Sequence, residues 1–301
     1  MITSDQKKHL IDTIVHREHL RPIGRIRRLL KDPLRALPYY ILAAISHIKP
    51  YKISFNTLWG DKMTGFLPEA NTFYYYGYCE ANLTSFLLRF LKGGHIFVDV
   101  GAHIGFYSML ASHLVENTGK VFSFEPTPWT FSLLNKNTSN KSNVKIENTG
   151  ISETEGIISF EDYGPGYGAY NTASDKGTML NFKPKKVEIK TIFLDRYFSE
   201  SSITPDFIKL DAEGFEYKIL LGMEATLKTT RPLITLEMAG DEKWVENCRK
   251  SSDTLFASNY KSFEMSDDGY IKECELKLPY TYTNILFIPV EKIESVKHLI
   301  K

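Results

Sequence analysis

Cysteine is scarce in this sequence, and its thiols are far apart. The 301 residues include only Cys79, Cys248 and Cys274. This spacing fits neither a disulfide framework nor the close ligand pairs of a zinc site. We therefore expect no structural disulfide and no cysteine-based metal centre.

Long apolar runs are also missing. The most apolar early stretch, Leu37–Ile48, is shorter than the about 20 residues that a membrane-spanning helix needs. The first residues lack the charged and then apolar pattern of a secretory signal. We expect a cytoplasmic protein, with peripheral contact on the inner face of a membrane as an alternative.

Charge is nearly balanced over the chain but is unevenly placed. The formal net charge is +1, which gives no overall attraction to nucleic acid. Residues 1–52 hold 11 Lys/Arg and 4 Asp/Glu, a net charge of +7, while the other residues hold 26 and 32, a net charge of −6. We expect residues 1–52 to form a basic helical arm. The arm would either touch an anionic surface or be a solvated amphipathic helix.

Strands and helices alternate from Ala81 onward, which predicts a parallel sheet with right-handed crossovers. The expected strands are His95–Val100, Lys120–Glu125, Val144–Asn148, Phe207–Asp211, Leu233–Glu237, Tyr260–Met265 and Ile285–Pro289. The expected helices are Ala81–Leu91, Phe106–Val115, one starting at Pro128, Phe215–Leu221 and Trp244–Phe256. Residues 53–301 are expected to be one domain, which residues 151–191 interrupt as an insert. Within the insert, Ile157–Phe160 and Val187–Thr191 are expected to be strands.

The segment VDVGAHIG, Val98–Gly105, carries the strongest functional signal. Its glycines follow an expected strand and open an expected helix, and Glu125 ends the next strand. Ligands of open parallel sheets bind at these carboxyl ends. The spacing G-x-x-x-G departs from the dinucleotide pattern G-x-G-x-x-G, and the phosphate loop G-x-x-x-x-G-K-[ST] is absent. The wider spacing suits S-adenosylmethionine (SAM), with Glu125 accepting hydrogen bonds from the ribose hydroxyls.

At these residues the sequence resembles the FkbM-type methyltransferase family. The matching segments are FVDVGAHIGFYS (Phe97–Ser108), VFSFEPTP (Val121–Pro128), TIFLD (Thr191–Asp195), PDFIKLDAEGFEYKILLGM (Pro205–Met223) and RPLITLE (Arg231–Glu237). The resemblance implies a Rossmann-like α/β fold of the class I methyltransferases. In it, a mostly parallel seven-stranded sheet carries helices on both faces.

The resemblance also implies an enzyme that methylates a hydroxyl on a sugar, glycan, glycolipid or natural product, with S-adenosylhomocysteine as the product. It places SAM against Tyr78, Glu80, Asp99, Gly101, Ala102, His103, Gly105, Glu125, Pro126, Thr149, Gly150 and Ile151. The alternatives are an RNA or protein methyltransferase of the same fold and a non-catalytic, membrane-associated SAM-binding protein. The amine-methylating signature D/N-P-P-Y/F is absent, because DAEG stands in its place.

The acceptor side is expected to hold a cluster of carboxylates. Asp211, Glu213 and Glu237 follow or end neighbouring strands, and such groups raise one another's pKa toward the range of a general base. The cluster also offers oxygen ligands to a divalent metal, although nothing in the spacing demands one. We expect Lys209 to neutralise a buried carboxylate rather than to act in catalysis.

The insert is expected to bind the acceptor. Its aromatic rings and amides, Tyr163, Tyr167, Tyr170 and Asn171, suit a sugar, and its glycines at 164, 166 and 168 would let it move as a lid. An ordinary surface loop is the alternative.

Overall fold

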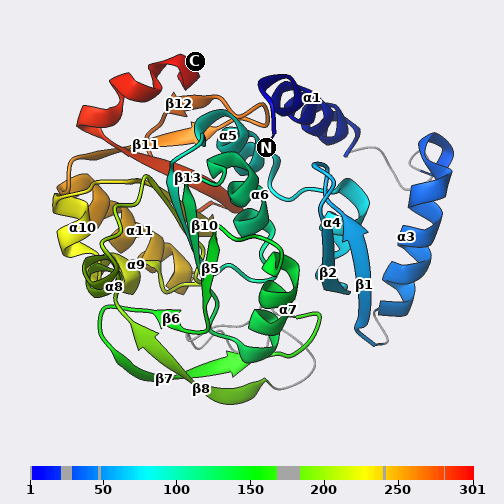
Figure 1. The fold of residues 1–301 in the computed structure, drawn as a ribbon, viewed down its shortest axis with the longest axis horizontal. Coiled ribbons are helices and arrows are strands. Elements are labelled where there is room, and N and C mark those ends of the chain that lie inside the picture. The colour runs from blue at the N-terminus through cyan, green and yellow to red at the C-terminus, as the bar shows by residue number, and fades with distance from the viewer. Residues whose placement is uncertain (1, 22–28, 47–48, 168–183, 240–241, 281) are drawn as a thin grey trace.

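An eight-stranded sheet forms the centre of the molecule (Figure 1). It belongs to a computed structural model that describes residues 2–21, 29–46, 49–167, 184–239, 242–280 and 282–301. The strand order is β12-β11-β13-β10-β9-β3-β4-β5. The bounds are β3 Ile96–Val100, β4 Lys120–Phe124, β5 Val144–Glu147, β9 Phe207–Leu210, β10 Leu233–Ala239, β11 Tyr260–Met265, β12 Ile271–Glu273 and β13 Tyr282–Pro289. Strands β5, β4, β3, β9 and β10 run parallel, whereas β13 pairs antiparallel with both β10 and β11.

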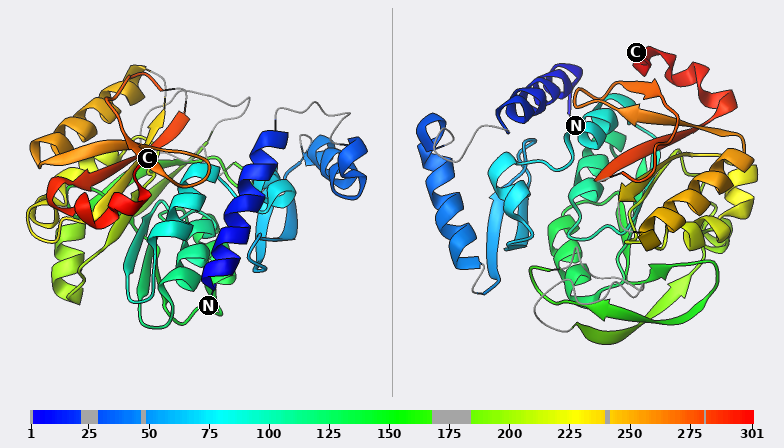
Figure 2. Two further views of the ribbon diagram at one scale, coloured as in Figure 1. Left: turned by 90° about the horizontal axis from the view of Figure 1, so that it is seen from above. Right: turned by 180° about the vertical axis from the view of Figure 1, so that it is seen from behind.

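Helices cover both faces of this sheet (Figures 1 and 2). One layer contains α5 Ala81–Phe90, α6 Phe106–Val115 and α7 Pro128–Thr138; the other contains α8 Leu194–Ser201, α9 Glu216–Leu221, α10 Glu224–Lys228 and α11 Glu242–Ala257. Alternate strand residues supply the two cores, since Phe97 packs in the first and Val98 in the second. The chain ends in the 3₁₀ helices η2 Val290–Lys292 and η3 Glu294–Leu299.

The expected class I Rossmann-like fold is confirmed, with one more strand than expected. Helix α6 and strand β11 have the predicted bounds, and the other predicted elements differ at their ends by a few residues. The additional strand is β12, which has only three residues and pairs antiparallel with β11 at the sheet edge. So short a strand carries no periodic pattern that a sequence could reveal.

The N-terminal segment is built into the molecule rather than standing apart as an arm. It comprises α1 Ser4–Leu20, α3 Pro33–Ser46, β1 Tyr51–Asn56, β2 Lys62–Leu67 and α4 Asn71–Tyr76. Helix α1 buries Leu10 and Ile14 in the same core as α5. Because β1 begins at Tyr51 and pairs with β2, the expected boundary after residue 52 must be corrected: it falls inside a strand.

The insert contains a second, smaller sheet. Its strands β6 Gly150–Ile151, β7 Gly156–Asp162 and β8 Lys185–Ile192 are arranged in the order β6-β8-β7. The predicted strands at 157–160 and 187–191 lie within β7 and β8. Figure 1 shows this sheet below the carboxyl ends of the central strands, so the insert adjoins the functional edge of the domain.

Asp61, in the β1–β2 turn, ties that hairpin to the domain. Its carboxylate accepts hydrogen bonds from Trp59 and from Lys141 Nζ at 3.0 Å, and it lies 2.8 Å from the His113 ring. Burial alone would raise the pKa of Asp61, but the His113 and Lys141 contacts outweigh it and lower the pKa to about 2. The ionised carboxylate therefore stabilises the fold above the pKa of an unfolded aspartate, and this contribution is lost as the pH falls from about 4 toward 2.

Asp61→Asn is expected to lower the free energy of unfolding by about 2 kcal/mol at neutral pH. The difference from wild type should shrink as the pH falls from about 4 toward 2, because the wild-type carboxylate loses its charge over this range. Urea unfolding at pH 7 and pH 3 measures it, with Asp12→Asn, an exposed change on α1, as the control. An equal deficit at both pH values would refute the assignment to the ionised carboxylate.

Candidate cofactor and acceptor site

A cavity of about 680 Å³ opens at the carboxyl ends of β3, β4, β9 and β10. This volume falls in the range of small-molecule sites, and the position is where open α/β sheets bind ligands. The predicted residues that line it are Glu80, Gly101, Ala102, His103, Glu125, Pro126, Thr149, Gly150, Ile151, Tyr167, Asp211, Glu213 and Glu237.

The geometry of the turn after β3 explains why it contains two glycines. Gly101 has φ +75°, and a Cβ there would lie 1.7 Å from the backbone oxygen of Asp211. Gly105 has φ +92°, and a Cβ there would lie 2.7 Å from Leu134. The first glycine therefore lets β3 and β9 converge at the cavity, and the second lets α6 pack on α7.

Glu125 is held at the end of β4 by backbone donors. His103 N donates to Oε2 at 3.0 Å, and Thr127 N donates to Oε1 at 2.9 Å. Burial raises the pKa of Glu125, while the charge of His103 and the donors from Thr127 act in the opposite direction. A carboxylate oxygen accepts more than one hydrogen bond, so each retains acceptor capacity toward the cavity that the residue lines.

Three predicted contact residues do not line the cavity and are corrected here. Asp99 is 1% exposed and accepts a hydrogen bond from Ser108 Oγ at 2.6 Å, beneath the turn. Gly105 serves helix packing. Tyr78 donates its hydroxyl to Glu18 Oε1 at 2.8 Å, which directs the ring toward α1 rather than into the cavity. Sequence spacing located these residues near the site but could not resolve the packing that keeps Asp99, Gly105 and Tyr78 out of the cavity lining.

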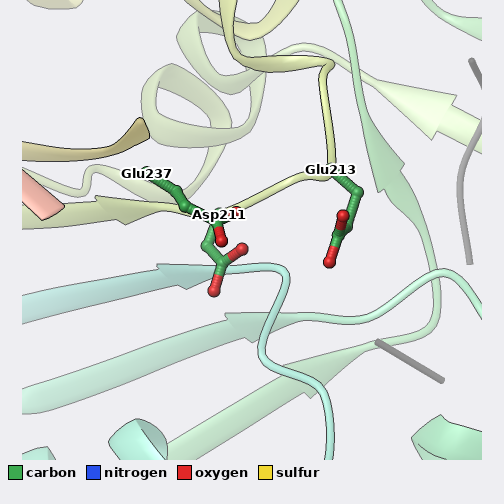
Figure 3. A group of neighbouring side chains, drawn as sticks. All are labelled: Asp211, Glu213 and Glu237. Atoms are coloured by element: carbon green, nitrogen blue, oxygen red, sulfur yellow. The ribbon is translucent and has the colours of Figure 1, made fainter. Parts of the chain in front are cut away.

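The carboxylates Asp211, Glu213 and Glu237 come together on the acceptor side (Figure 3). One oxygen of each lies within 4.8 Å of the others. Glu237 is 6% exposed at the carboxyl half of β10, and Asp211 and Glu213 follow β9 and are partly exposed. Glu213 has a φ of +52°, a left-handed conformation in the tight loop after β9.

Lys209 makes the pKa values of this cluster unequal. Its Nζ donates to Asp211 Oδ2 at 2.7 Å and lies 3.9 Å from Asp99 Oδ1, with its side chain 2% exposed. Burial raises the pKa of Asp211, but the Lys209 charge outweighs it and keeps the pKa below its ordinary value. Burial and then the charges of Asp211 and Glu213 raise the pKa of Glu237 well above its ordinary value. The prediction that these carboxylates raise one another's pKa is therefore right for Glu237 and wrong for Asp211.

The same three carboxylates could hold a divalent cation through oxygen ligands. One feature of this structure counts against the fit. The Lys209 ammonium already donates a hydrogen bond to one Asp211 oxygen, at 2.7 Å. The metal therefore remains the alternative rather than the preferred use of the cluster.

A charged pair at the cofactor turn was not foreseen. His103 Nε2 lies 2.6 Å from Glu69 Oε1, and both side chains reach the cavity wall. Burial lowers the pKa of His103, but Glu69 outweighs it and raises the pKa to about 9, so the imidazole is positive at neutral pH. Glu69 follows β2, far from the recognisable motifs, and nothing in its sequence context indicates a site.

The predicted Glu80 lies in the cavity wall, where its carboxylate accepts hydrogen bonds from the Tyr107 hydroxyl and from Asn284 Nδ2, each at 2.5 Å. Other residues of the wall were not predicted. The unforeseen part of the lining includes several aromatic residues, among them Phe73, Phe106, Tyr107, Phe215 and Trp244. In the sequence these rings are indistinguishable from ordinary core residues.

The insert contributes only part of the predicted acceptor contacts. Tyr167 lines the cavity, whereas Tyr163 is 5% exposed and does not. Tyr170 and Asn171 lie outside the described residues. Gly164 and Gly166 both have positive φ, and Gly166 also lines the cavity.

The sheet order, with its antiparallel β13, and the glycine turn facing Glu125 define a class I methyltransferase fold of the Rossmann type. Residues 99–265 match the family described as the methyltransferase FkbM domain, and the chain belongs to this family. The expected family is therefore confirmed.

The similar proteins include both a curated relative and solved structures. The hexuronic acid methyltransferase AglP of Haloferax volcanii is 29% identical over 163 residues, which are 54% of this chain and 63% of that protein. The chain thus spans less than two thirds of that relative's length. The methyltransferase FkbM of Methylobacillus flagellatus is 17% identical over 73% of this chain and 54% of its own, with a TM-score of 0.43. A SAM-dependent O-methyltransferase of Thermotoga maritima is 12% identical over 79% and 77%, with a TM-score of 0.40.

None of the helices in the described residues has the length and apolarity that crossing a bilayer would require.

Proposed function

We propose that this protein transfers a methyl group from SAM to a hydroxyl of a sugar or glycan. One observation carries the proposal: the glycine turn with Glu125 and the cluster Asp211, Glu213 and Glu237 line the same cavity. A cofactor held at the first would present its methyl group toward an acceptor held at the second. The name of the Haloferax volcanii relative, a hexuronic acid methyltransferase, supports a glycan acceptor.

On the cofactor side, Glu125 would accept the ribose hydroxyls, and the backbone at Gly101 and Ala102 would lie close to the amino-acid end of the ligand. Thr149, Gly150 and Ile151 would flank the adenine. The positive His103 lies at the same wall, where it would attract the ligand carboxylate.

SAM supplies the electrophilic methyl group on its sulfonium. Residues of this chain align the acceptor oxygen in line with the carbon–sulfur bond, and such positioning can lower a barrier by roughly 7–11 kcal/mol. The new oxygen–carbon bond forms as the carbon–sulfur bond breaks, and S-adenosylhomocysteine leaves. The hydroxyl proton passes to a carboxylate of the cluster, for which Glu237 is better suited than Asp211 because its pKa is raised whereas that of Asp211 is lowered.

Glu125→Ala is expected to weaken SAM binding by about 10–100-fold, because it removes hydrogen bonds to a charged acceptor worth about 1.5–3 kcal/mol. Glu125→Gln should lose less, since its amide oxygen still accepts a hydrogen bond. Isothermal calorimetry measures both, with Glu264→Ala, an exposed change on β11 outside the cavity, as the control. Wild-type affinity in both Glu125 variants would eliminate the ribose assignment.

The function itself is tested by methyl-transfer assays with labelled SAM on nucleotide sugars, oligosaccharides and lipid-linked glycans. Acceptors that contain a hexuronic acid come first. We expect label on one of them, and its loss when Glu125 is replaced at SAM concentrations below the variant's Kd. Binding of SAM without transfer to any of these classes would contradict the proposal.

A further inference from the structure

Helix α3 carries an apolar stripe that faces away from the protein. The stripe consists of Leu30, just before the helix, and Leu34, Leu37, Ile41 and Ile45 along it, which are 78, 90, 54, 51 and 50% exposed. A spacing of three or four residues places Leu34, Leu37, Ile41 and Ile45 on one side of α3. These five are half of the ten large apolar residues that are strongly exposed among the described residues. So dense a patch marks a contact surface.

The opposite side of α3 is already occupied by the protein. Ala36 is fully buried, the Tyr39 ring lies 4.9 Å from the Tyr75 ring between centroids, and Leu42 packs against the core. Both figures place α3 at the outer edge of the molecule (Figures 1 and 2). The stripe therefore remains available to something outside the chain.

Positive charge is concentrated in the sequence on both sides of this helix. Residues 21–52 hold eight Lys/Arg and one Asp, so the net charge of +7 belongs entirely to this segment, and residues 1–20 are neutral overall. Among them, Lys31 and Lys49 flank α3 and are exposed, as is Lys52 on β1. An aliphatic face bordered by cations is typical of helices that lie in the plane of an anionic membrane surface.

We infer that α3 docks this protein on a membrane surface that contains anionic phospholipid. The stripe enters the boundary between headgroups and acyl chains, and the flanking lysines contact lipid phosphates. The same charge argues against a second copy as the occupant, because pairing two stripes would bring two segments of net charge +7 together.

Docking would also bring the cavity close to the membrane. Pro50 follows α3 and packs against Gly166 in the cavity wall, where a Cβ on Gly166 would lie 2.9 Å from Pro50 Cβ. The docked end of the helix thus adjoins the acceptor side of the site. The inference does not depend on methyl transfer, since binding to lipid can be measured without any acceptor.

The test is co-sedimentation of the full chain with vesicles of phosphatidylcholine alone and of phosphatidylcholine mixed with phosphatidylglycerol. We expect binding to the mixed vesicles, weakening as salt is added. The triple variant Leu34→Ser/Leu37→Ser/Ile41→Ser should bind at least about 100-fold more weakly, because three buried aliphatic side chains are removed. Replacing Lys31, Lys49 and Lys52 with Glu should cost at least about fivefold per residue.

The matched control is Ile157→Ser/Leu221→Ser, which removes exposed apolar residues elsewhere, 65% and 48% exposed. It should bind like the wild type, and SAM affinity measured by calorimetry reports whether each variant is folded. Wild-type binding of the stripe variant, or no preference for anionic vesicles, would overturn the inference. So would a dimer in light scattering that only the stripe variant loses. Failure of methyl transfer with intact vesicle binding would instead count against the proposed function alone.

Discussion

Glu237→Gln is expected to lower turnover by about 10²–10⁴-fold while leaving SAM affinity near the wild-type value. The loss follows from removing the carboxylate that takes the hydroxyl proton. Affinity should persist because Glu237 lies on β10, which β9 separates from β3 and its cofactor turn. Single-turnover rates and calorimetry on the same acceptor separate the two effects.

The pH profile gives an independent readout of the same residue. A base acts only when it is ionised, and burial with the nearby charges of Asp211 and Glu213 raises the pKa of Glu237. Wild-type turnover should therefore rise with pH through the upper pKa of the coupled pair Asp211/Glu237. Glu237→Gln should remove this rise, which a merely structural defect would leave in place.

Variants of the other two carboxylates test their roles in the cluster. Asp211→Asn should also slow turnover, because Asp211 lies between Lys209 and Glu237 and fixes the charge beside the base. Glu213→Gln tests the third member of the cluster. Glu264→Gln, exposed and outside the cavity, is the matched control.

Two outcomes would change the interpretation. Near-normal turnover in all three cluster variants would mean that the site works by alignment alone. This result would fit an acceptor carboxylate, which a hexuronic acid also offers and which needs no deprotonation at neutral pH. Activity that requires added Mg²⁺ and disappears with a chelator would make the cluster a metal site.

The sequence predicted the elements whose pattern is local. The buried strand at Ile96–Val100, the glycine turn and helix α6 follow directly from apolar runs and glycine spacing, and the structure places them accordingly. The carboxylates Asp211 and Glu237 were found because strand ends at one edge of a parallel sheet must converge. Each of these inferences needed only topology and the residue type at a strand end.

The parts that the sequence did not reveal depend on long-range packing. Glu69 reaches His103 only because the β1–β2 hairpin folds onto α7, where Thr64 N donates to Asn137 Oδ1 at 2.8 Å. Similarly, α1 was expected in a peripheral arm because residues 1–52 carry a net charge of +7, yet Ile14 is 1% exposed. A few buried residues among many charged ones give a weak periodic signal.

Lys209→Met is expected to destabilise the fold by about 3–5 kcal/mol. Lys209 is 2% exposed and is the cation between Asp211 and Asp99, both of which burial would otherwise disfavour as anions. Methionine has a similar length, so the change removes the charge with little loss of packing. Urea unfolding of the ligand-free protein measures the difference.

The control for this change is Lys228→Met, whose ion pair with Glu224 is solvent-exposed and should contribute less than about 1 kcal/mol. The pH dependence of the stability deficit tests whether the charge of Lys209 is responsible. Without Lys209 the folded-state pKa values of Asp99 and Asp211 must rise, so the variant's deficit should be smallest at low pH and grow toward neutrality. Adding Asp211→Asn to Lys209→Met should restore part of the stability, since it removes one uncompensated buried charge. A deficit that is independent of pH and additive in the double variant would show that Lys209 acts by packing, and its role as the cation that compensates Asp99 and Asp211 would have to be abandoned.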